Sequence, residues 1–341
     1  MASMFDDGVL DDPERLARID DDLRRVAGWG AEVRRADVAA SEALAGIAEQ
    51  GRPRAVVAAG PDGRLFRAVL EPVCPVPFVA WPHPGLPGWA GPLDLAVVMS
   101  TTGTGEEEIG VVGEAVRRGC DLLVAAPVPS PLAEAAGSRA TTLLPAGTTD
   151  PLAQSVPVLC ALHRLGLGPE VSATPVADAL DEVAVRCAPG SGLEANPAKE
   201  LALVLADAVP VVWGGSVLAA RAARRVAEEL RAASGRPAIA GEEAQIVPML
   251  LRAAEVDIFA DPYDAEPTAR PALVVLDDGA ATAPALRASQ QRILDAAERR
   301  GVRVHTVTAT EGPDVGRFAS LLATGRFAAA YLSLALGRAE A

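Results

Sequence analysis

Short apolar runs and helical segments alternate along most of this chain, and this alternation restricts its fold more than any other feature. Strands that alternate with helices indicate a parallel sheet covered on both faces, because each connection must cross over the sheet. The runs lie at 54–60, 76–82, 93–101, 121–127 and 141–147, and again at 209–215, 236–241, 256–261, 271–279 and 302–310. The sequence therefore predicts an α/β protein with two lobes, each a five-stranded parallel sheet with helices on both faces.

The order of these patterns also suggests where the domains begin and end. Residues 11–50 have apolar positions at helical spacing and precede the first strand-like run. The segment 187–197 is rich in Gly, Pro, Ser and Asn and separates the two sets of runs. We predict an N-terminal helical region at 1–50, a first lobe at 51–187 and a second lobe at 188–341. A chain of 341 residues also exceeds the roughly 250–300 residues at which a single core stops growing.

The charge of the chain limits its partners. The formal net charge is −14, so a nucleic acid or an anionic membrane would be repelled, and neither is expected as a partner. An anionic metabolite would need a local source of positive potential, which the N-terminus of a helix supplies.

The cysteines and the hydropathy of the sequence indicate in which cellular compartment the protein is expected. The four cysteines are scattered without a C-x-x-C pair, which favours free thiols in a reducing compartment over a disulfide framework or zinc site. The acidic N-terminal segment lacks an apolar core and is not expected to be a signal peptide, and no apolar run of about 18 residues appears. We therefore expect a cytoplasmic protein with no membrane span. No histidine has metal-ligand spacing with another, so we expect no metal.

The segment MSTTGTGEEE, residues 99–108, is the sharpest local feature. It follows an apolar run and opens a helix, so backbone N–H groups, hydroxyls and the helix dipole can together hold a phosphate. Gly103 and Gly105 would let the backbone approach such a ligand closely. The alternative is an ordinary helix start, capped by Thr104, with Glu106 to Glu108 complementing the dipole.

STTGTGEE resembles the S-x-S-G-x-T-x-E loop that binds phosphate in SIS (sugar isomerase) domains. The tandem lobes, the N-terminal helical region and the segment NPAKELA at 196–202 resemble the bifunctional phosphoglucose/phosphomannose isomerase family. This resemblance implies a sugar-phosphate ligand and an aldose–ketose isomerisation that proceeds by proton transfer without a cofactor. It also implies a homodimer, because two chains complete each other's sites in that family.

The resemblance assigns candidate binding residues. Gly105 stands where the family usually has a threonine, so one hydroxyl is missing. In the first loop, Asp62 falls near the position of a serine that faces the sugar. The residues matched to phosphate binding are Ser100, Thr102, Gly103 and Thr104, and those matched to sugar binding are Gly60, Asp62, Gly215 and Ser216.

The family's catalytic residues are not matched. Ala232, Pro248 and Leu152 stand at the positions of its base glutamate, ring-opening histidine and arginine, and no lysine follows the stretch from Tyr331 to Gly337. Candidate replacements are Glu242 and Glu243, since paired carboxylates can split their pKa values and supply a base. His83, in a proline-rich loop, is a candidate for ring opening. The alternative for the two glutamates is a solvated turn or helix start.

Two functions follow from this pattern. The first is a phosphoglucose/phosphomannose isomerase-like enzyme with a divergent site. The second is a catalytically inactive protein that senses a sugar phosphate and regulates a partner protein. A dinucleotide-dependent oxidoreductase ranks last, because no G-x-G-x-x-G follows a strand with an acidic residue about 20 positions later.

Overall fold

The computed structural model describes residues 7–47, 51–60, 63–254, 270–280 and 283–339. The chain divides into two compact units, which we call the first lobe (Trp29–Asp178) and the second lobe (the residues up to Gly28 together with those from Ala179). This packing groups the first helices of the chain with its C-terminal half. The domain limits expected from the sequence stay a prediction.

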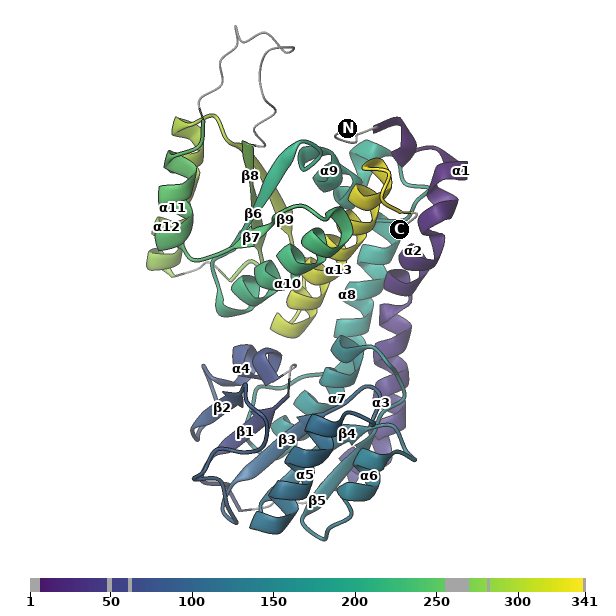
Figure 1. Cartoon of the computed structure of the whole chain (residues 1–341), viewed down its shortest axis with the longest axis vertical. Helices are drawn as coiled ribbons and strands as arrows, with labels where there is room; N and C mark the ends of the chain where they lie inside the picture. The colour runs from purple at the N-terminus through teal and green to yellow at the C-terminus, as the bar shows by residue number, and fades with distance from the viewer. Residues whose placement is uncertain (1–6, 48–50, 61–62, 255–269, 281–282, 340–341) are drawn as a thin grey trace, which may run out of the picture. The chain divides into compact units, whose positions relative to one another are not determined.

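The first lobe is built on a parallel sheet with the strand order β2-β1-β3-β4-β5 (Figure 1). Each of the five predicted runs contains one strand, and β3 lies at the centre of the sheet. The strands are β1 (Val56–Ala59), β2 (Phe78–Trp81), β3 (Leu95–Met99), β4 (Asp121–Ala126) and β5 (Thr141–Pro145). All residues of β1 and β3 are buried, as expected for strands covered on both faces.

Helices cover both faces of this sheet. Alternate strand residues such as Val57, Val98 and Val124 pack with Val111 and Leu132 in one core, so α5 and α6 lie on that face. Helices α3 and α7 pack against each other and against strands β5 and β4. The helices are α3 (Trp29–Ala45), α4 (Gly63–Leu70), α5 (Glu106–Arg118), α6 (Pro131–Ala135), α7 (Pro151–Arg164) and α8 (Ala173–Arg186), which continues into the second lobe.

The second lobe repeats this plan with a parallel sheet of order β7-β6-β8-β9. The described sheet has four strands where the sequence predicts five, because the predicted strand at 256–261 lies outside the described residues. The strands are β6 (Ala208–Gly214), β7 (Ile239–Ala240), β8 (Arg270–Asp277) and β9 (Arg303–Thr308). Two parallel sheets flanked by helices confirm the predicted fold class.

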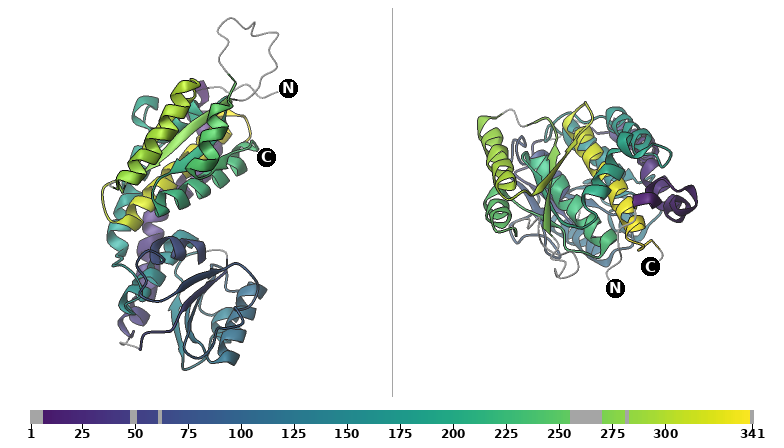
Figure 2. Two further views of the ribbon diagram at one scale, coloured as in Figure 1. Left: turned by 90° about the vertical axis from the view of Figure 1, so that its left-hand side faces the viewer. Right: turned by 90° about the horizontal axis from the view of Figure 1, so that it is seen from above.

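In the second lobe, α11 and α12 cover one face of the sheet and α10 and α13 the other (Figures 1 and 2). The first face is closed by Trp213, Ile246 and Ile293 in one core. The elements are η1 (Asp7–Leu10), α1 (Pro13–Leu16), η2 (Ala17–Ile19), α2 (Asp20–Ala27), η3 (Leu193–Ala195), α9 (Pro197–Val204), α10 (Val217–Ser234), α11 (Glu243–Leu251), α12 (Pro284–Arg299) and α13 (Asp314–Ala335).

Among the described residues, helix α13 is long and apolar enough to cross a membrane by length and composition alone. Its residues are mostly buried within the second lobe, including Phe327 and Tyr331. It packs against α9 and α10. A helix that is apolar all round is expected at such a central place in a fold, so α13 reads as a core helix.

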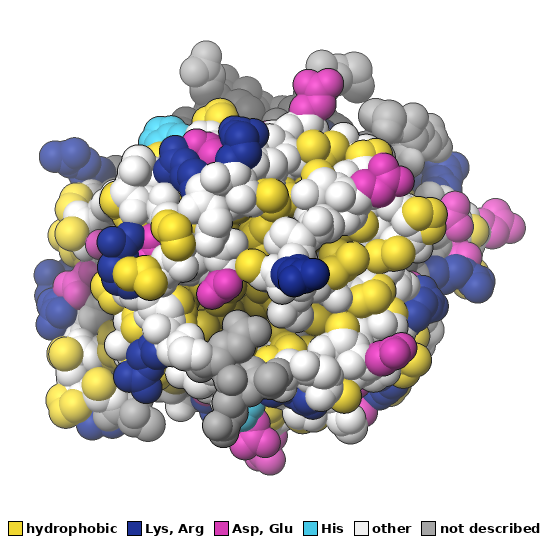
Figure 3. Space-filling model, turned by 90° about the horizontal axis from the view of Figure 1, so that it is seen from below, with side chains coloured by type: hydrophobic (Ala, Val, Ile, Leu, Met, Phe, Trp, Pro, Cys, Tyr) yellow, Lys and Arg dark blue, Asp and Glu magenta, His cyan; other side chains and the backbone are white. Residues whose placement is uncertain are grey.

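Figure 3 shows one face of the molecule, where basic and acidic side chains are interspersed among apolar ones. The negative net charge is thus not gathered into one acidic field on this face. Local positive potential for an anion can therefore coexist with a net charge of −14.

Candidate functional site

The loop Ser100–Gly105 connects the central strand β3 to helix α5 at the carboxyl edge of the first sheet. In open α/β sheets, ligands bind at the carboxyl ends of the strands. Ser100 is buried and its N–H continues the ladder by donating to the Ala125 carbonyl at 2.9 Å. This hydrogen bond therefore fixes the position of the first residue of the loop at the end of β3.

The shape of this loop depends on Gly103. Its N–H donates to the Ser100 hydroxyl oxygen at 3.1 Å, and its carbonyl accepts from the Leu132 N–H at 3.0 Å. Its φ is +67°, and an added β-carbon would lie 2.5 Å from Ser130. Glycine is required here for both conformation and space.

The loop gathers the four residues that the sequence assigned to phosphate. The hydroxyls of Thr102 and Thr104 are 3.2 Å apart and both residues are exposed. Among the described residues, the N–H groups of Thr101 and Thr102 and of the first three residues of α5 have no hydrogen-bond partner. Gly105, the residue before α5, has no side chain to cap the helix. These free donors at a helix N-terminus form a cradle for an anion. Their assignment to phosphate stays a prediction.

The carboxylate of Glu108 folds back over Gly105, so closely that a β-carbon at residue 105 would collide with it. A threonine at 105, as in the resembling family, would require Glu108 to move. Glu108 also brings a negative charge to the end of α5 that favours anions. In the described geometry, this side chain competes electrostatically with a bound phosphate.

The other first-lobe candidates lie in neighbouring loops. Gly60 follows β1 with φ +93° and open space around it, which suits a close backbone approach. Asp62 lies outside the described residues. His83 is exposed after β2, with its ring centroid 5.2 Å from that of Trp81 in an edge-to-face arrangement. The loop that carries His83 is anchored further on, where the Leu86 N–H donates to Glu114 at 2.9 Å.

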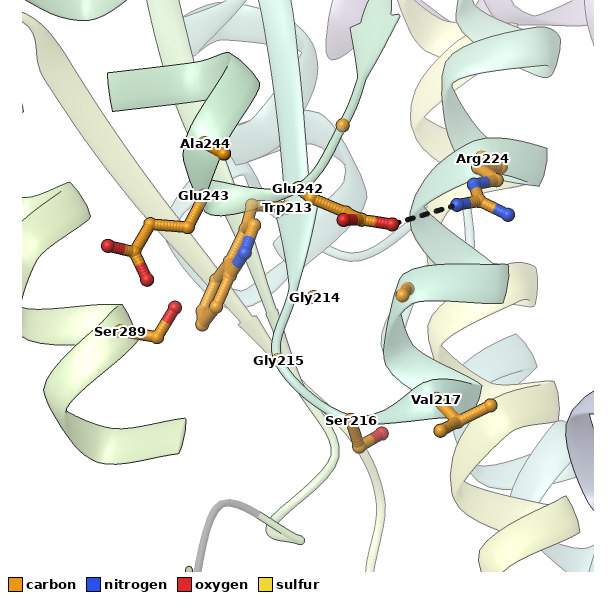
Figure 4. A pocket seen from close by; sticks show the side chains of 12 residues that line it. Trp213, Gly214, Gly215, Ser216, Val217, Arg224, Glu242, Glu243, Ala244 and Ser289 are labelled. Carbon is orange, nitrogen blue, oxygen red and sulfur yellow. Dashed lines mark ion pairs between the residues drawn. The ribbon is translucent and has the colours of Figure 1, made fainter. Parts of the chain in front are cut away.

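The second lobe holds a cavity of 560 Å³ that brings its own candidates together. Residues after β6 and β7 line it with side chains from α10 and α12 (Figure 4). The edge of the Trp213 indole packs against Gly215, where a β-carbon would come within 3.0 Å of the ring. Its polar and aromatic lining comprises Trp213, Ser216, Arg224, Glu242, Glu243 and Ser289.

The two adjacent glutamates point to opposite sides of Trp213 (Figure 4). Glu242 faces Arg224, with 3.9 Å between the charged atoms, and its side chain is 79% exposed. Glu243 pairs with Arg292 through two hydrogen bonds of 2.5 and 2.8 Å. The Arg292 guanidinium, with help from Ser289, lowers the pKa of Glu243 to about 2. A general base works best with a pKa near the working pH, so this pairing disfavours Glu243 in that role.

Ser216 is held as a structural cap. Its hydroxyl oxygen accepts from the Ala219 N–H at 2.9 Å, at the start of α10. The same hydroxyl donates to the carboxylate of Asp278, which is 6% exposed. With both contacts made, the Ser216 side chain is oriented toward Asp278, and its role toward a sugar stays a prediction.

Asp278 also shows how the two lobes differ. Strand β8 has the place in the second sheet that β3 has in the first, so the loop after β8 is the counterpart of the phosphate loop. That counterpart begins Asp277–Asp278–Gly279, with Gly279 and Ala280 N–H groups donating to the two carboxylates. Anionic side chains already occupy these donors, so the second loop repels phosphate.

Sequence reasoning missed several of these residues. Trp213, Arg224 and Asp278 could have been noted as polar or aromatic residues at strand ends or in the next helix. Gln154, on α7, donates to the Ser100 carbonyl at 2.9 Å, and no local motif predicts that contact. Leu152, at the position of the family's arginine, is buried, so that position offers no charge. Within the described residues, no group of His, Cys, Asp or Glu could hold a metal ion.

Solved structures share this architecture over nearly the whole chain. Tagatose-6-phosphate ketose/aldose isomerase from Escherichia coli aligns with a TM-score of 0.65 and 16% identity, covering 94% of each chain. The C-terminal domain of glucosamine-fructose-6-phosphate aminotransferase from Francisella tularensis gives 0.63 and 12%, covering 93% of this chain and 96% of that one. A glucose-6-phosphate isomerase like protein from Thermus thermophilus gives 0.50 and 18%, covering 88% and 90%. These likenesses show the fold class, two SIS-like lobes that are each built on a parallel sheet flanked by helices.

The sequence itself narrows this class for one part of the chain. Residues 194–339 match the bacterial phospho-glucose isomerase C-terminal SIS domain family. No curated protein matches the chain. This part of the chain therefore matches an SIS domain, and the resemblance to the SIS phosphosugar isomerase family that the sequence predicts is confirmed.

Proposed function

We propose that this protein binds a sugar phosphate, with the phosphate held by the loop Ser100–Gly105 and the start of α5. The observation that carries the proposal is the cradle of unpartnered N–H groups with the hydroxyls of Thr102 and Thr104 beside it. Gly103 keeps the loop in a shape that only glycine permits. SIS-type lobes of this fold belong to proteins whose names specify phosphorylated sugars, which supports the same ligand class here.

The ion pair of Glu243 and the residues at the family's catalytic positions favour binding of a sugar phosphate without turnover. Aldose–ketose isomerisation needs a base that takes a proton from a carbon next to the carbonyl. Glu243 is held ionised by Arg292 with its pKa at about 2, and the residues at the family's catalytic positions are apolar. We therefore propose a sensor or regulator as the principal function, acting on a partner protein from the cytoplasm as a homodimer.

Isomerisation is the second candidate, and Glu242 favours it. This carboxylate lines the 560 Å³ cavity, its side chain is 79% exposed, and it lies 3.9 Å from the Arg224 guanidinium. It also takes part in the capping box at the start of α11. Under this candidate Glu242 is the base, and the assignment of His83 to ring opening stays a separate prediction from the sequence. Changing Glu242 to Gln would then abolish turnover while leaving phosphate affinity unchanged.

A thermal-shift titration with glucose 6-phosphate, mannose 6-phosphate and fructose 6-phosphate tests the proposal, with the unphosphorylated sugars as controls. A ligand at 100 times its Kd stabilises a protein by about 2.7 kcal/mol, which such a measurement resolves. Turnover is assayed on every sugar phosphate that binds. A shift without turnover supports the sensor, and a shift with turnover supports the isomerase. No shift with any phosphorylated sugar contradicts both.

The loop is tested with isosteric variants. Changing Thr102 or Thr104 to Val removes a hydroxyl while keeping the shape of the side chain. Loss of one hydrogen bond to a charged phosphate costs roughly 1.5–3 kcal/mol, so the Kd should rise about 10-fold to 150-fold. The matched control is Thr306→Val, at an exposed position of β9 in the second lobe. An unchanged Kd in both loop variants would show that the phosphate does not bind at this loop.

A further inference from the structure

Gln154 is a buried polar residue that links helix α7 to the phosphate loop. Its side chain reaches from the first turn of α7 to Ser100, which is 54 residues earlier in the sequence. The Nε2 group donates to the Ser100 carbonyl at 2.9 Å, and Gln154 is only 2% exposed. This contact therefore lies beneath the loop rather than on its surface.

The contact fixes the peptide that joins Ser100 to Thr101. In a planar trans peptide the C=O and N–H bonds point in opposite directions. Because Gln154 holds the Ser100 carbonyl, the Thr101 N–H is directed away from Gln154. That N–H is one of the donors with no partner among the described residues. Gln154 thus determines the direction of a free donor that it does not touch.

The carbonyl oxygen of the Gln154 side chain indicates that this glutamine is not present for the sake of stability. The Gln154 Oε1 atom is buried and has no hydrogen-bond partner in the described part of the chain. A buried polar atom without a partner costs free energy, and an apolar side chain of similar size would avoid that cost. Helix α7 is buried along most of its length, and its residues Val156 and Val158 are fully buried.

We propose that Gln154 is a positioning residue for the phosphate loop, which holds the Ser100–Thr101 peptide so that its N–H faces the ligand. This inference rests on the proposed function, because the ligand is the phosphate assigned to the loop. It predicts that a donor at residue 154 is needed for affinity and not for folding.

The test compares Gln154→Met and Gln154→Leu with wild type. Both variants replace glutamine with an apolar side chain of similar size and so remove the donor. Either variant suffices if the other folds poorly. The matched control is Gln291→Leu on α12, where the side chain of an exposed glutamine donates to Asp295 at 2.7 Å. Calorimetry measures the Kd for a hexose 6-phosphate, thermal unfolding measures stability, and the backbone amide resonance of Thr101 reports the peptide orientation.

We expect both variants to unfold at or above the wild-type temperature, to bind about tenfold more weakly, and to show a displaced Thr101 resonance without ligand. The control should match wild type in all three readouts. Wild-type affinity with an unmoved Thr101 resonance would overturn the inference while leaving the proposed function intact. A parallel fall in stability and affinity, with Thr101 unmoved, would reduce Gln154 to a structural role and overturn it too. Failure of wild type to bind any hexose phosphate would overturn the proposed function and the inference together.

Discussion

At the scale of single residues, the first-lobe loop contains groups that favour an anion and one that opposes it. Free N–H groups at the start of α5 attract a phosphate, while the Glu108 carboxylate folds back over Gly105. The same carboxylate stabilises the free helix by complementing its dipole. Removing its charge should therefore affect the free protein and the complex in opposite directions.

Glu108→Gln is expected to tighten sugar-phosphate binding by about 1 kcal/mol, or roughly fivefold in Kd, because a like charge beside the ligand is removed. The same change should lower the free energy of unfolding by ~0.3–1 kcal/mol through the lost interaction with the helix dipole. Calorimetry and thermal unfolding measure the two effects. Glu107→Gln is the control, since Glu107 is exposed one position earlier on α5. Weaker binding in the Glu108 variant would show that this carboxylate contacts the ligand favourably.

The cysteines differ in reactivity for a physical reason. Burial raises the pKa of Cys160 to about 11 and that of Cys187 to about 12, and it also raises the pKa of Cys120. The thiolate is the reactive form, so these three thiols stay protonated and inert at pH 8. Cys74 is only partly buried.

A disulfide reagent at pH 8 should therefore label Cys74 first in the folded protein and all four cysteines after denaturation. Reaction of the other three should speed up only at strongly alkaline pH or when the protein unfolds. Mass spectrometry of the labelled peptides identifies the sites. Rapid labelling of Cys187 in the native protein would contradict its described burial.

At the scale of elements, the only lysine of the chain secures the segment before α9. The Lys199 side chain is 1% exposed, and its Nζ donates to Asp11 and to the carbonyls of Pro189 and Ser191. Its ammonium also lies 5.7 Å from the ring centroid of Tyr331. All three N–H donors are used, so this lysine joins the N-terminal helices to the core of the second lobe.

Lys199→Met should lower the free energy of unfolding of the second lobe by ~2–3 kcal/mol, because two carbonyls lose a charged donor. Asp11→Asn is the control and should cost under about 1 kcal/mol, since the Asp11 side chain is 59% exposed. Urea denaturation monitored in the second lobe measures both. If both variants lost the same free energy of unfolding, the ion pair with Asp11 would be the source of the stabilisation instead of the contacts with the two carbonyls.

Strands could be predicted from the sequence where a continuous apolar run marks them. Strands β3 and β4 fall within the runs at 93–101 and 121–127, because a strand buried on both faces must be apolar throughout. Strand β7 has two residues, Ile239 and Ala240, so its run at 236–241 overstated its length.

The candidate site was predictable only where it is local in sequence. The loop after β3 was visible as a motif, because Gly103 and its neighbours act within six residues of one another. Glu242 and Glu243 were read as a pair, yet adjacent residues at a helix start project in different directions, so they face Arg224 and Arg292 separately. The contact of Gln154 with Ser100 joins residues 54 positions apart, so only the folded chain reveals it.

At the scale of the whole molecule, the two lobes share a sheet plan but differ in chemistry. The loop after β3 offers free donors, whereas its counterpart after β8 is filled by Asp277 and Asp278. Phosphate should therefore bind once per chain, in the first lobe. The second lobe has a cavity of its own, lined by the charged side chains of Arg224, Glu242 and Glu243 and the hydroxyls of Ser216 and Ser289.

The proposed homodimer is tested separately by light scattering coupled to gel filtration. The chain has a mass of 35.0 kDa, so the account predicts twice that value. The measurement is repeated with a saturating hexose phosphate, because a sensor can change its assembly when the ligand binds. A mass of 35.0 kDa under both conditions would contradict the homodimer.

The most direct test of the central claim is to follow glycine amide resonances while a hexose 6-phosphate is added. We expect the resonances of Gly103 and Gly105 to shift in a saturable way and that of Gly279, in the counterpart loop, to stay unchanged. The unphosphorylated hexose should leave all three unchanged, because the phosphate supplies the charge that the cradle binds. Saturable shifts at Gly279 with none at Gly103 and Gly105, or no shift at all, would contradict phosphate binding by the first lobe.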